Sequence, residues 1–61
     1  MDNSAVRPVK VILVDDNKRI RSLVREVLQL ESNIEVCDEA SSLKDISLLI
    51  EKWQPHILVI D

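Results

Sequence analysis

Glycine is absent from this 61-residue sequence, which also has one cysteine, one aromatic residue and no long hydrophobic run. Without glycine the chain cannot form a dinucleotide-binding fingerprint or a P-loop, because both need glycines where the backbone approaches phosphate. The single cysteine, Cys37, excludes an internal disulfide and suits a reduced, intracellular protein. We expect its thiol to be packed in the core; a nucleophilic thiol is the alternative.

The scarcity of aromatic residues and of positive charge narrows the range of partners. Trp53 is the one aromatic residue, so stacking on single-stranded nucleic acid is not expected. The formal net charge of −3 argues against a nucleic-acid-binding surface. No apolar run approaches the roughly 20 residues of a membrane helix, and the polar start MDNSAVRPVK does not resemble a signal peptide. We therefore expect a soluble cytoplasmic protein without membrane contact.

The sequence contains a regular alternation of strand and helix patterns. The runs VKVILV (residues 9–14) and HILVI (residues 56–60) predict strands buried on both faces, and IEVCDEA (residues 34–40) predicts a shorter one. Strands that alternate with helices favour a parallel sheet with right-handed crossovers, so the fold class is α/β, doubly wound in kind. Residues 1–8 are expected to be a flexible N-terminal segment.

Two apolar stripes at helical spacing lie between the predicted strands. The stripes consist of Ile20, Leu23, Val24, Val27 and Leu28, and of Ile46, Leu49, Ile50 and Trp53. Asn17 or Asp16 is expected to cap the first helix, and Ser42 with Asp45 is expected to form a capping box for the second. Pro55 predicts the end of the second helix near Trp53.

Acidic residues follow two of the predicted strands. Asp15 and Asp16 come directly after the first strand, and Asp61 comes directly after the third. If these strands are neighbours, all three carboxylates lie at one edge of the sheet, where parallel α/β sheets bind ligands. Two like charges ~4 Å apart repel by about 4 kcal/mol at an effective dielectric of about 20, so such a cluster needs protonation or a bound cation. An all-oxygen set suits Mg²⁺ or Mn²⁺. The alternative is that the paired acids only cap a helix.

The segments ILVDD, IEVCDEA and PHILVID, in that order, resemble the first half of a response-regulator receiver domain, the phosphoacceptor module of two-component signalling. The resemblance covers residues 9–61 and implies a flavodoxin-like half-domain, βαβαβ, with strand order 2-1-3, cut after the phosphoacceptor. It also implies that Asp61 accepts the phosphoryl group, that Asp16 binds Mg²⁺ directly and that Asp15 binds it through water. Mn²⁺ is the possible substitute.

The resemblance implies that the phosphoryl group comes from a histidine kinase or a phosphotransfer protein. Receivers control an output domain that is often DNA-binding, so transcription regulation is expected and DNA would be contacted only through an output domain missing here. No enzymatic activity is expected, because the segment lacks the hydroxyl residue and the lysine that bind the phosphoryl group in receivers. The alternative is a non-phosphorylated interaction module that self-associates through the open edge of its third strand.

Half of the positive charges fall early in the first predicted helix. The cluster consists of Lys18, Arg19, Arg21 and Arg25. It is expected to be a solvated helix face, and a docking patch for a kinase or an output domain is the alternative.

Overall fold

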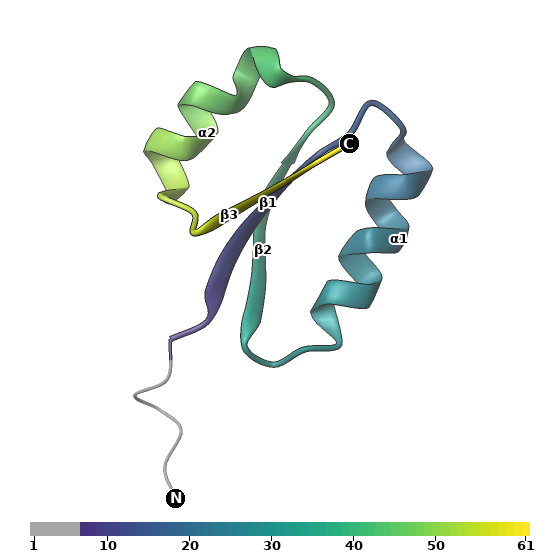
Figure 1. Ribbon diagram of the computed structural model, residues 1–61, viewed down its shortest axis with the longest axis vertical. Helices are drawn as coiled ribbons and strands as arrows, with labels where there is room; N and C mark the ends of the chain where they lie inside the picture. The colour runs from purple at the N-terminus through teal and green to yellow at the C-terminus, as the bar shows by residue number, and fades with distance from the viewer. Residues whose placement is uncertain (1–6) are drawn as a thin grey trace, which may run out of the picture.

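The computed structural model describes residues 7–61, so most of the expected flexible segment 1–8 lies outside the described residues. The elements are β1 (Val9–Val14), α1 (Lys18–Gln29), β2 (Ile34–Ala40), the 3₁₀ turn η1 (Leu43–Asp45), α2 (Ile46–Trp53) and β3 (Ile57–Ile60). The three strands form one parallel sheet in the order β2-β1-β3. The two helices cover opposite faces of this sheet (Figure 1). The predicted α/β half of a flavodoxin-like fold is confirmed.

The central strand β1 supplies most of the buried core. Because side chains alternate across a strand, β1 contributes to a separate cluster on each face of the sheet. Val11 and Leu13 pack with Val24 and Leu28 of α1, whereas Ile12 and Val14 pack on the side of α2. Ile12 is 0% exposed, as expected for the middle of a sheet that is covered on both faces.

The helix boundaries agree with the sequence signals except at the start of α2. The side chain of Asn17 accepts a hydrogen bond from the Ile20 amide at 3.1 Å, as its capping role predicts. The expected capping box is wrong: Ser42 accepts from the Lys44 amide and begins η1, and Asp45 makes no side-chain cap bond. The 3₁₀ turn tightens the chain there, so α2 begins only at Ile46. Its end at Trp53 is confirmed.

Two expectations about burial are wrong, one for Cys37 and one for the apolar stripe of α1. Cys37 is half-buried and lies where the register of β1 with β2 shifts, between the pairs Val11–Val36 and Ile12–Asp38. A bulge residue is left out of the pairing, which explains why the thiol does not reach the core. Burial and the charge of Glu35 nevertheless raise the pKa of the Cys37 thiol. In α1, Leu23 and Val27 are 53% and 63% exposed, so the predicted stripe is covered only in part.

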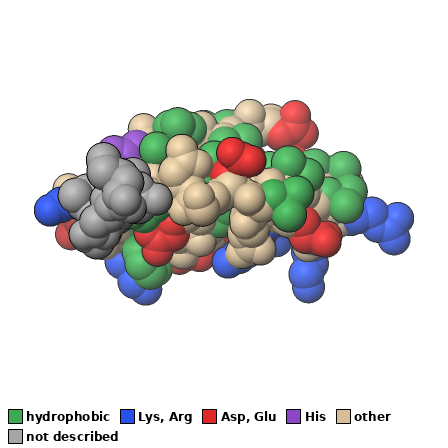
Figure 2. All heavy atoms as spheres, turned by 90° about the horizontal axis from the view of Figure 1, so that it is seen from below, with side chains coloured by type: hydrophobic (Ala, Val, Ile, Leu, Met, Phe, Trp, Pro, Cys, Tyr) green, Lys and Arg blue, Asp and Glu red, His purple; other side chains and the backbone are tan. Residues whose placement is uncertain are grey.

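Strand β3 is the least covered element of the sheet. Leu58 packs on the α2 side, but Ile57, Val59 and Ile60 are 49%, 39% and 51% exposed. The expectation that this strand is buried on both faces is therefore wrong. Ile57 and Val59 point to the face that α1 leaves open because it packs on β1 and β2, and Ile60 is exposed at the end of the strand. Figure 2 shows hydrophobic side chains at the surface of the face seen from below, between charged ones. Within residues 7–61, no helix is long and apolar enough to cross a membrane.

Candidate functional site

The predicted acidic residues lie at one edge of the sheet, at the carboxyl ends of β1 and β3. The Asp15 amide donates to the Ala40 carbonyl oxygen at 3.1 Å, which continues the pairing of β1 with β2 by one residue. The Asp61 amide donates to the Val14 carbonyl oxygen at 3.2 Å and does the same for β3. The backbones that carry these carboxylates are therefore held by the sheet itself. In Figure 1 the chain ends beside the turn that leads into α1.

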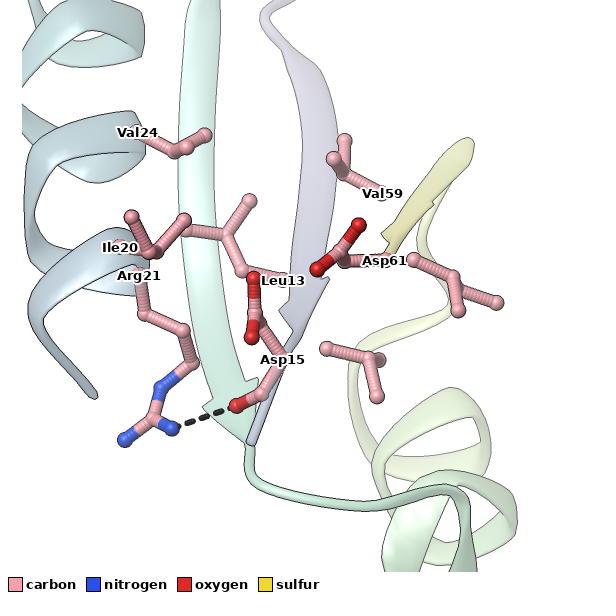
Figure 3. A pocket seen from close by; sticks show the side chains of 9 residues that line it. Leu13, Asp15, Ile20, Arg21, Val24, Val59 and Asp61 are labelled. Carbon is pink, nitrogen blue, oxygen red and sulfur yellow. Dashed lines mark hydrogen bonds between the residues drawn. The ribbon is translucent and has the colours of Figure 1, made fainter. Parts of the chain in front are cut away.

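Two hollows meet at this edge. One, of about 300 Å³, is lined by all three predicted site residues, Asp15, Asp16 and Asp61, together with Ser41 and Ser42 of the loop after β2. The other, of about 350 Å³, lies between α1 and β3 and is also lined by Asp15 and Asp61 (Figure 3). Its remaining lining is apolar except for one arginine: Leu13, Val14, Ile20, Arg21, Val24, Val59 and Ile60.

The three carboxylates differ in how firmly they are held. Asp15 is 8% exposed, and its Oδ1 accepts a hydrogen bond from the Asn17 amide at 2.8 Å. Asp16 and Asp61 are exposed, so their side chains can rotate at little cost. The arrangement gives one fixed acid and two adjustable ones around the same hollow.

The chemistry of this donor set fits Mg²⁺ or Mn²⁺. Both ions take oxygen ligands and keep several waters, and the hollow beside Asp15, Asp16 and Asp61 has room for them. Among residues 7–61, no three His, Cys, Asp or Glu side chains are drawn together closely enough to hold a metal as they stand. Because one oxygen of Asp15 already accepts from Asn17, the exposed Asp16 and Asp61 are the residues that would turn toward an ion.

Arg21 lies at the site, although it was expected only as one member of the basic cluster. Its Nε donates to Glu39 of β2 at 3.0 Å and its Nη1 donates to the Asp15 carbonyl oxygen at 2.6 Å. Arg25 also donates to Glu39. The expectation of a solvated face is therefore wrong for these two arginines of the basic cluster. The signal was available as two arginines one helical turn apart, but their partner on β2 could be identified only from the packing.

Glu39 is held in its charged form by the two arginines. Burial by itself would raise the pKa of Glu39, but the hydrogen bonds from Arg25 and Arg21 outweigh burial and lower that pKa below its ordinary value. The side chains of Arg21 and Glu39 are 15% and 22% exposed, so water screens their attraction less than it screens a surface pair.

The opposite end of the sheet carries a separate set of polar contacts. His56 Nδ1 accepts the Lys10 amide at 2.9 Å, and Lys10 Nζ donates to the Trp53 carbonyl oxygen at the end of α2. Trp53 Nε1 donates to Asp38 Oδ2 at 2.9 Å, which ties α2 to β2. The Glu39 amide and the Trp53 indole both lower the pKa of Asp38. These contacts position α2. Lys10 and His56 lie at the end of the sheet opposite the acids, whereas Asp38 pairs in register with Ile12 in the middle of β1.

A parallel β2-β1-β3 sheet with acids at the ends of β1 and β3 is the arrangement of a receiver-like α/β segment. Sequence comparison agrees with that class. The chain is similar to protein-glutamate methylesterase/protein-glutamine glutaminase 2 of Saccharophagus degradans, with 36% identity over 56 residues that cover 92% of this chain and 16% of the relative. No family model matches, and no solved structure matches.

Two further relatives carry the same enzyme name. One, from Burkholderia pseudomallei, is 34% identical over 59 residues, which are 97% of this chain and 16% of the relative. The other, from Methanococcus maripaludis, is 30% identical over 53 residues, which are 87% of this chain and 14% of the relative. A receiver-like segment fits the fold, and the matched regions span most of this chain. The chain spans about a sixth of the length of the curated relatives it matches.

The similarity corrects the expectation that no enzyme is involved. The relatives are named as methylesterases and glutaminases, and the region they share with this chain is the receiver-like one. They also give no support to a DNA-binding output or to transcription regulation. This chain matches only about a sixth of the length of these relatives. It therefore contains no motif from the rest of them, and the DNA-binding output expected from the resemblance was wrong.

Proposed function

We propose that this chain is the phosphoacceptor segment of a receiver module and that Asp61 takes up the phosphoryl group. The single observation that carries the proposal is the hollow at the sheet edge, which Asp15, Asp16 and Asp61 line together. Asp61 stands at the end of a strand that pairs with β1, so its backbone is held at this edge while its carboxylate stays free to turn.

In the proposed step, a carboxylate oxygen of Asp61 attacks the phosphorus of a phosphohistidine on the donor protein. The new O–P bond forms as the P–N bond breaks, and the imidazole nitrogen keeps the electron pair and takes up a proton. A carboxylate oxygen attacks without losing a proton, so the step needs no general base. Mg²⁺ held by Asp16 and Asp61, with Asp15 acting through water, would supply positive charge that offsets repulsion of the phosphoryl oxygens.

The test is phosphoryl incorporation in the intact protein from a small acyl phosphate donor in the presence of Mg²⁺. We expect Asp61→Asn to abolish incorporation, because the amide is not a nucleophile. Glu51→Gln removes one exposed carboxylate from α2 and is the matched control, which should incorporate like the unaltered protein. Equal incorporation by the Asp61→Asn variant would overturn the proposal.

The similarity supports a more specific assignment for the intact protein. Because the curated relatives are protein-glutamate methylesterase/protein-glutamine glutaminases, the output under control is proposed to be an esterase or amidase acting on glutamate or glutamine side chains of a protein. The phosphodonor is proposed to be a histidine kinase, and the compartment is proposed to be the cytoplasm. Phosphorylation of Asp61 should then change the hydrolysis rate of a methylated protein substrate.

A second candidate function follows from the open face of β3. Ile57, Val59 and Ile60 are exposed on an edge strand, and such strands pair readily with other chains. In this alternative the chain self-associates as a non-phosphorylated interaction module. The Asp61→Asn variant separates the two functions, because it removes phosphoryl uptake and leaves association intact.

A further inference from the structure

The polar bonds around Asp15 converge on the peptide that joins the two acids following β1. The Asp15 amide is held by Ala40, and its side chain is held by the Asn17 amide. The remaining backbone group, the Asp15 carbonyl oxygen, accepts from Arg21 Nη1 at 2.6 Å (Figure 3). This oxygen belongs to the peptide bond between Asp15 and Asp16. Arg21 therefore sets the orientation of the peptide from which the Asp16 side chain departs.

Arg21 is itself held from a third element. Its Nε donates to Glu39 Oε1 at 3.0 Å, and Glu39 belongs to β2, where it pairs in register with Leu13. The guanidinium has a planar, rigid set of donors, so one bond to Glu39 fixes the direction in which the other donors point. Hydrogen bonds therefore connect Glu39 of β2, through Arg21 of α1, to the turn that carries Asp15 and Asp16. The Arg21 side chain is only 15% exposed.

We infer that Arg21 is a positioning residue for the divalent-cation site: through the Asp15 carbonyl oxygen it holds Asp16 where Asp16 and Asp61 can share an ion. This inference rests on the proposed function, because it assumes that these acids bind a divalent cation. Groups that orient metal ligands commonly change metal affinity by about 10–100-fold when they are altered.

Charge and geometry act in opposite directions at this position. Removing the positive charge of Arg21 would strengthen cation binding at the neighbouring acids, whereas losing the bond to Asp15 would weaken it. Arg21→Lys separates the two effects, since it keeps the charge and loses the two-armed bond to Glu39 and Asp15. Arg25→Lys is the matched control: Arg25 also pairs with Glu39, and the bond to the Asp15 carbonyl oxygen comes from Arg21.

The experiment is a Mn²⁺ titration of the intact protein, followed by the electron paramagnetic resonance signal of the free ion. We expect Arg21→Lys to weaken Mn²⁺ binding by about tenfold and Arg25→Lys to change it less than twofold. The ¹⁵N shift of the Asp16 amide, which belongs to the peptide bonded to Arg21, should move in Arg21→Lys and not in Arg25→Lys. A loss of packing alone would not produce that pattern.

Thermal unfolding of each variant shows whether it is folded during the titration. If Arg21→Lys is not folded, Glu39→Gln replaces it, because this variant keeps Arg21 and weakens its anchor; we expect a smaller loss of affinity in the same direction. Equal Mn²⁺ affinities for the arginine variants, together with an unmoved Asp16 amide, would overturn the inference.

The same Mn²⁺ titration shows whether a negative result concerns only the role of Arg21 or the proposed cation site itself. If the unaltered protein binds Mn²⁺ and Asp16→Asn does not, the site exists, and the arginine variants alone decide the role of Arg21. If Asp16→Asn binds as tightly as the unaltered protein, the acids do not form the cation site, and both the site assignment and the role of Arg21 fall.

Discussion

The half of the sheet formed by β1 and β2 differs sharply from the half formed by β3. On the first, α1 and α2 cover both faces, Ile12 has no exposed surface, and Arg21 and Arg25 tie α1 to Glu39. On the second, α1 leaves Val59 open, and Ile57 is half exposed. Both halves nevertheless deliver an acid to the same edge. Positioning Asp61 requires only the pairing of β3 with β1, whereas burying β3 requires more cover than residues 7–61 provide.

This comparison predicts that shortening an apolar side chain to alanine lowers the free energy of unfolding much more in β1 than in β3. Ile12→Ala removes buried atoms at the centre of the sheet and should lower the free energy of unfolding by about 2–5 kcal/mol. Val59→Ala, on the neighbouring strand, should cost about 1 kcal/mol or less, because its side chain is already in contact with water. Urea denaturation measures both; similar losses would show that β3 is as well covered as β1.

The ion pairs on the covered half predict a pH dependence. Since the Arg25 and Arg21 bonds lower the pKa of Glu39 in the folded state, their stabilisation is complete above the ordinary value of 4.5 and is lost as the pH falls through the folded pKa. At pH 7, Glu39→Gln should lower the free energy of unfolding by on the order of 1 kcal/mol. The difference from the unaltered protein should shrink below pH 4.5 in denaturation curves.

Glu51→Gln is the control for that experiment because it also removes one carboxylate, from the exposed surface of α2. Its effect should be small at every pH. A Glu39→Gln deficit that stayed constant down to pH 3 would contradict the assigned ion pairs.

The exposed side chains of β3 predict that the chain self-associates through this strand. The unaltered 61-residue chain should self-associate at micromolar concentration through β3, and Val59→Lys should shift it to monomer because it places a charge on the apolar face. Leu48→Lys, on the 72% exposed side chain in α2, should associate like the unaltered chain. Sedimentation velocity decides; a monomeric unaltered chain, or association that survives Val59→Lys, would remove the interaction-module alternative.

The sequence predicted those features that depend on local chemistry or on a simple period. The strands, the Asn17 cap, the end of α2 before Pro55 and the placing of Asp15 and Asp61 at one edge are of this kind. The bulge at Cys37 was missed because alternation does not reveal one inserted residue. The apolar run HILVI by itself predicted burial on both faces, because a run shows what a strand can bury but not what covers it. The exposure of β3 was expected only from the open edge that the implied strand order gives it.

The contact between Arg21 and Asp15 was missed for a different reason. It depends on the distance between a helix and a strand that only the folded chain fixes, and on Glu39, which is 18 residues further along the sequence. With this contact, the site consists of three acids at the sheet edge and an arginine that is hydrogen-bonded to the backbone carrying two of them. The enzymatic output suggested by the relatives was beyond any inference from these 61 residues.

The most direct test of the phosphoacceptor assignment is chemical trapping of the acyl phosphate. The intact protein is phosphorylated with a small acyl phosphate and Mg²⁺, reduced with borohydride and digested, and the peptides are sequenced by mass spectrometry. We expect reduction to convert Asp61 to homoserine and to leave Asp15 and Asp16 unchanged. Homoserine at either of those positions, or phosphoryl uptake without reduction at Asp61, would contradict this assignment.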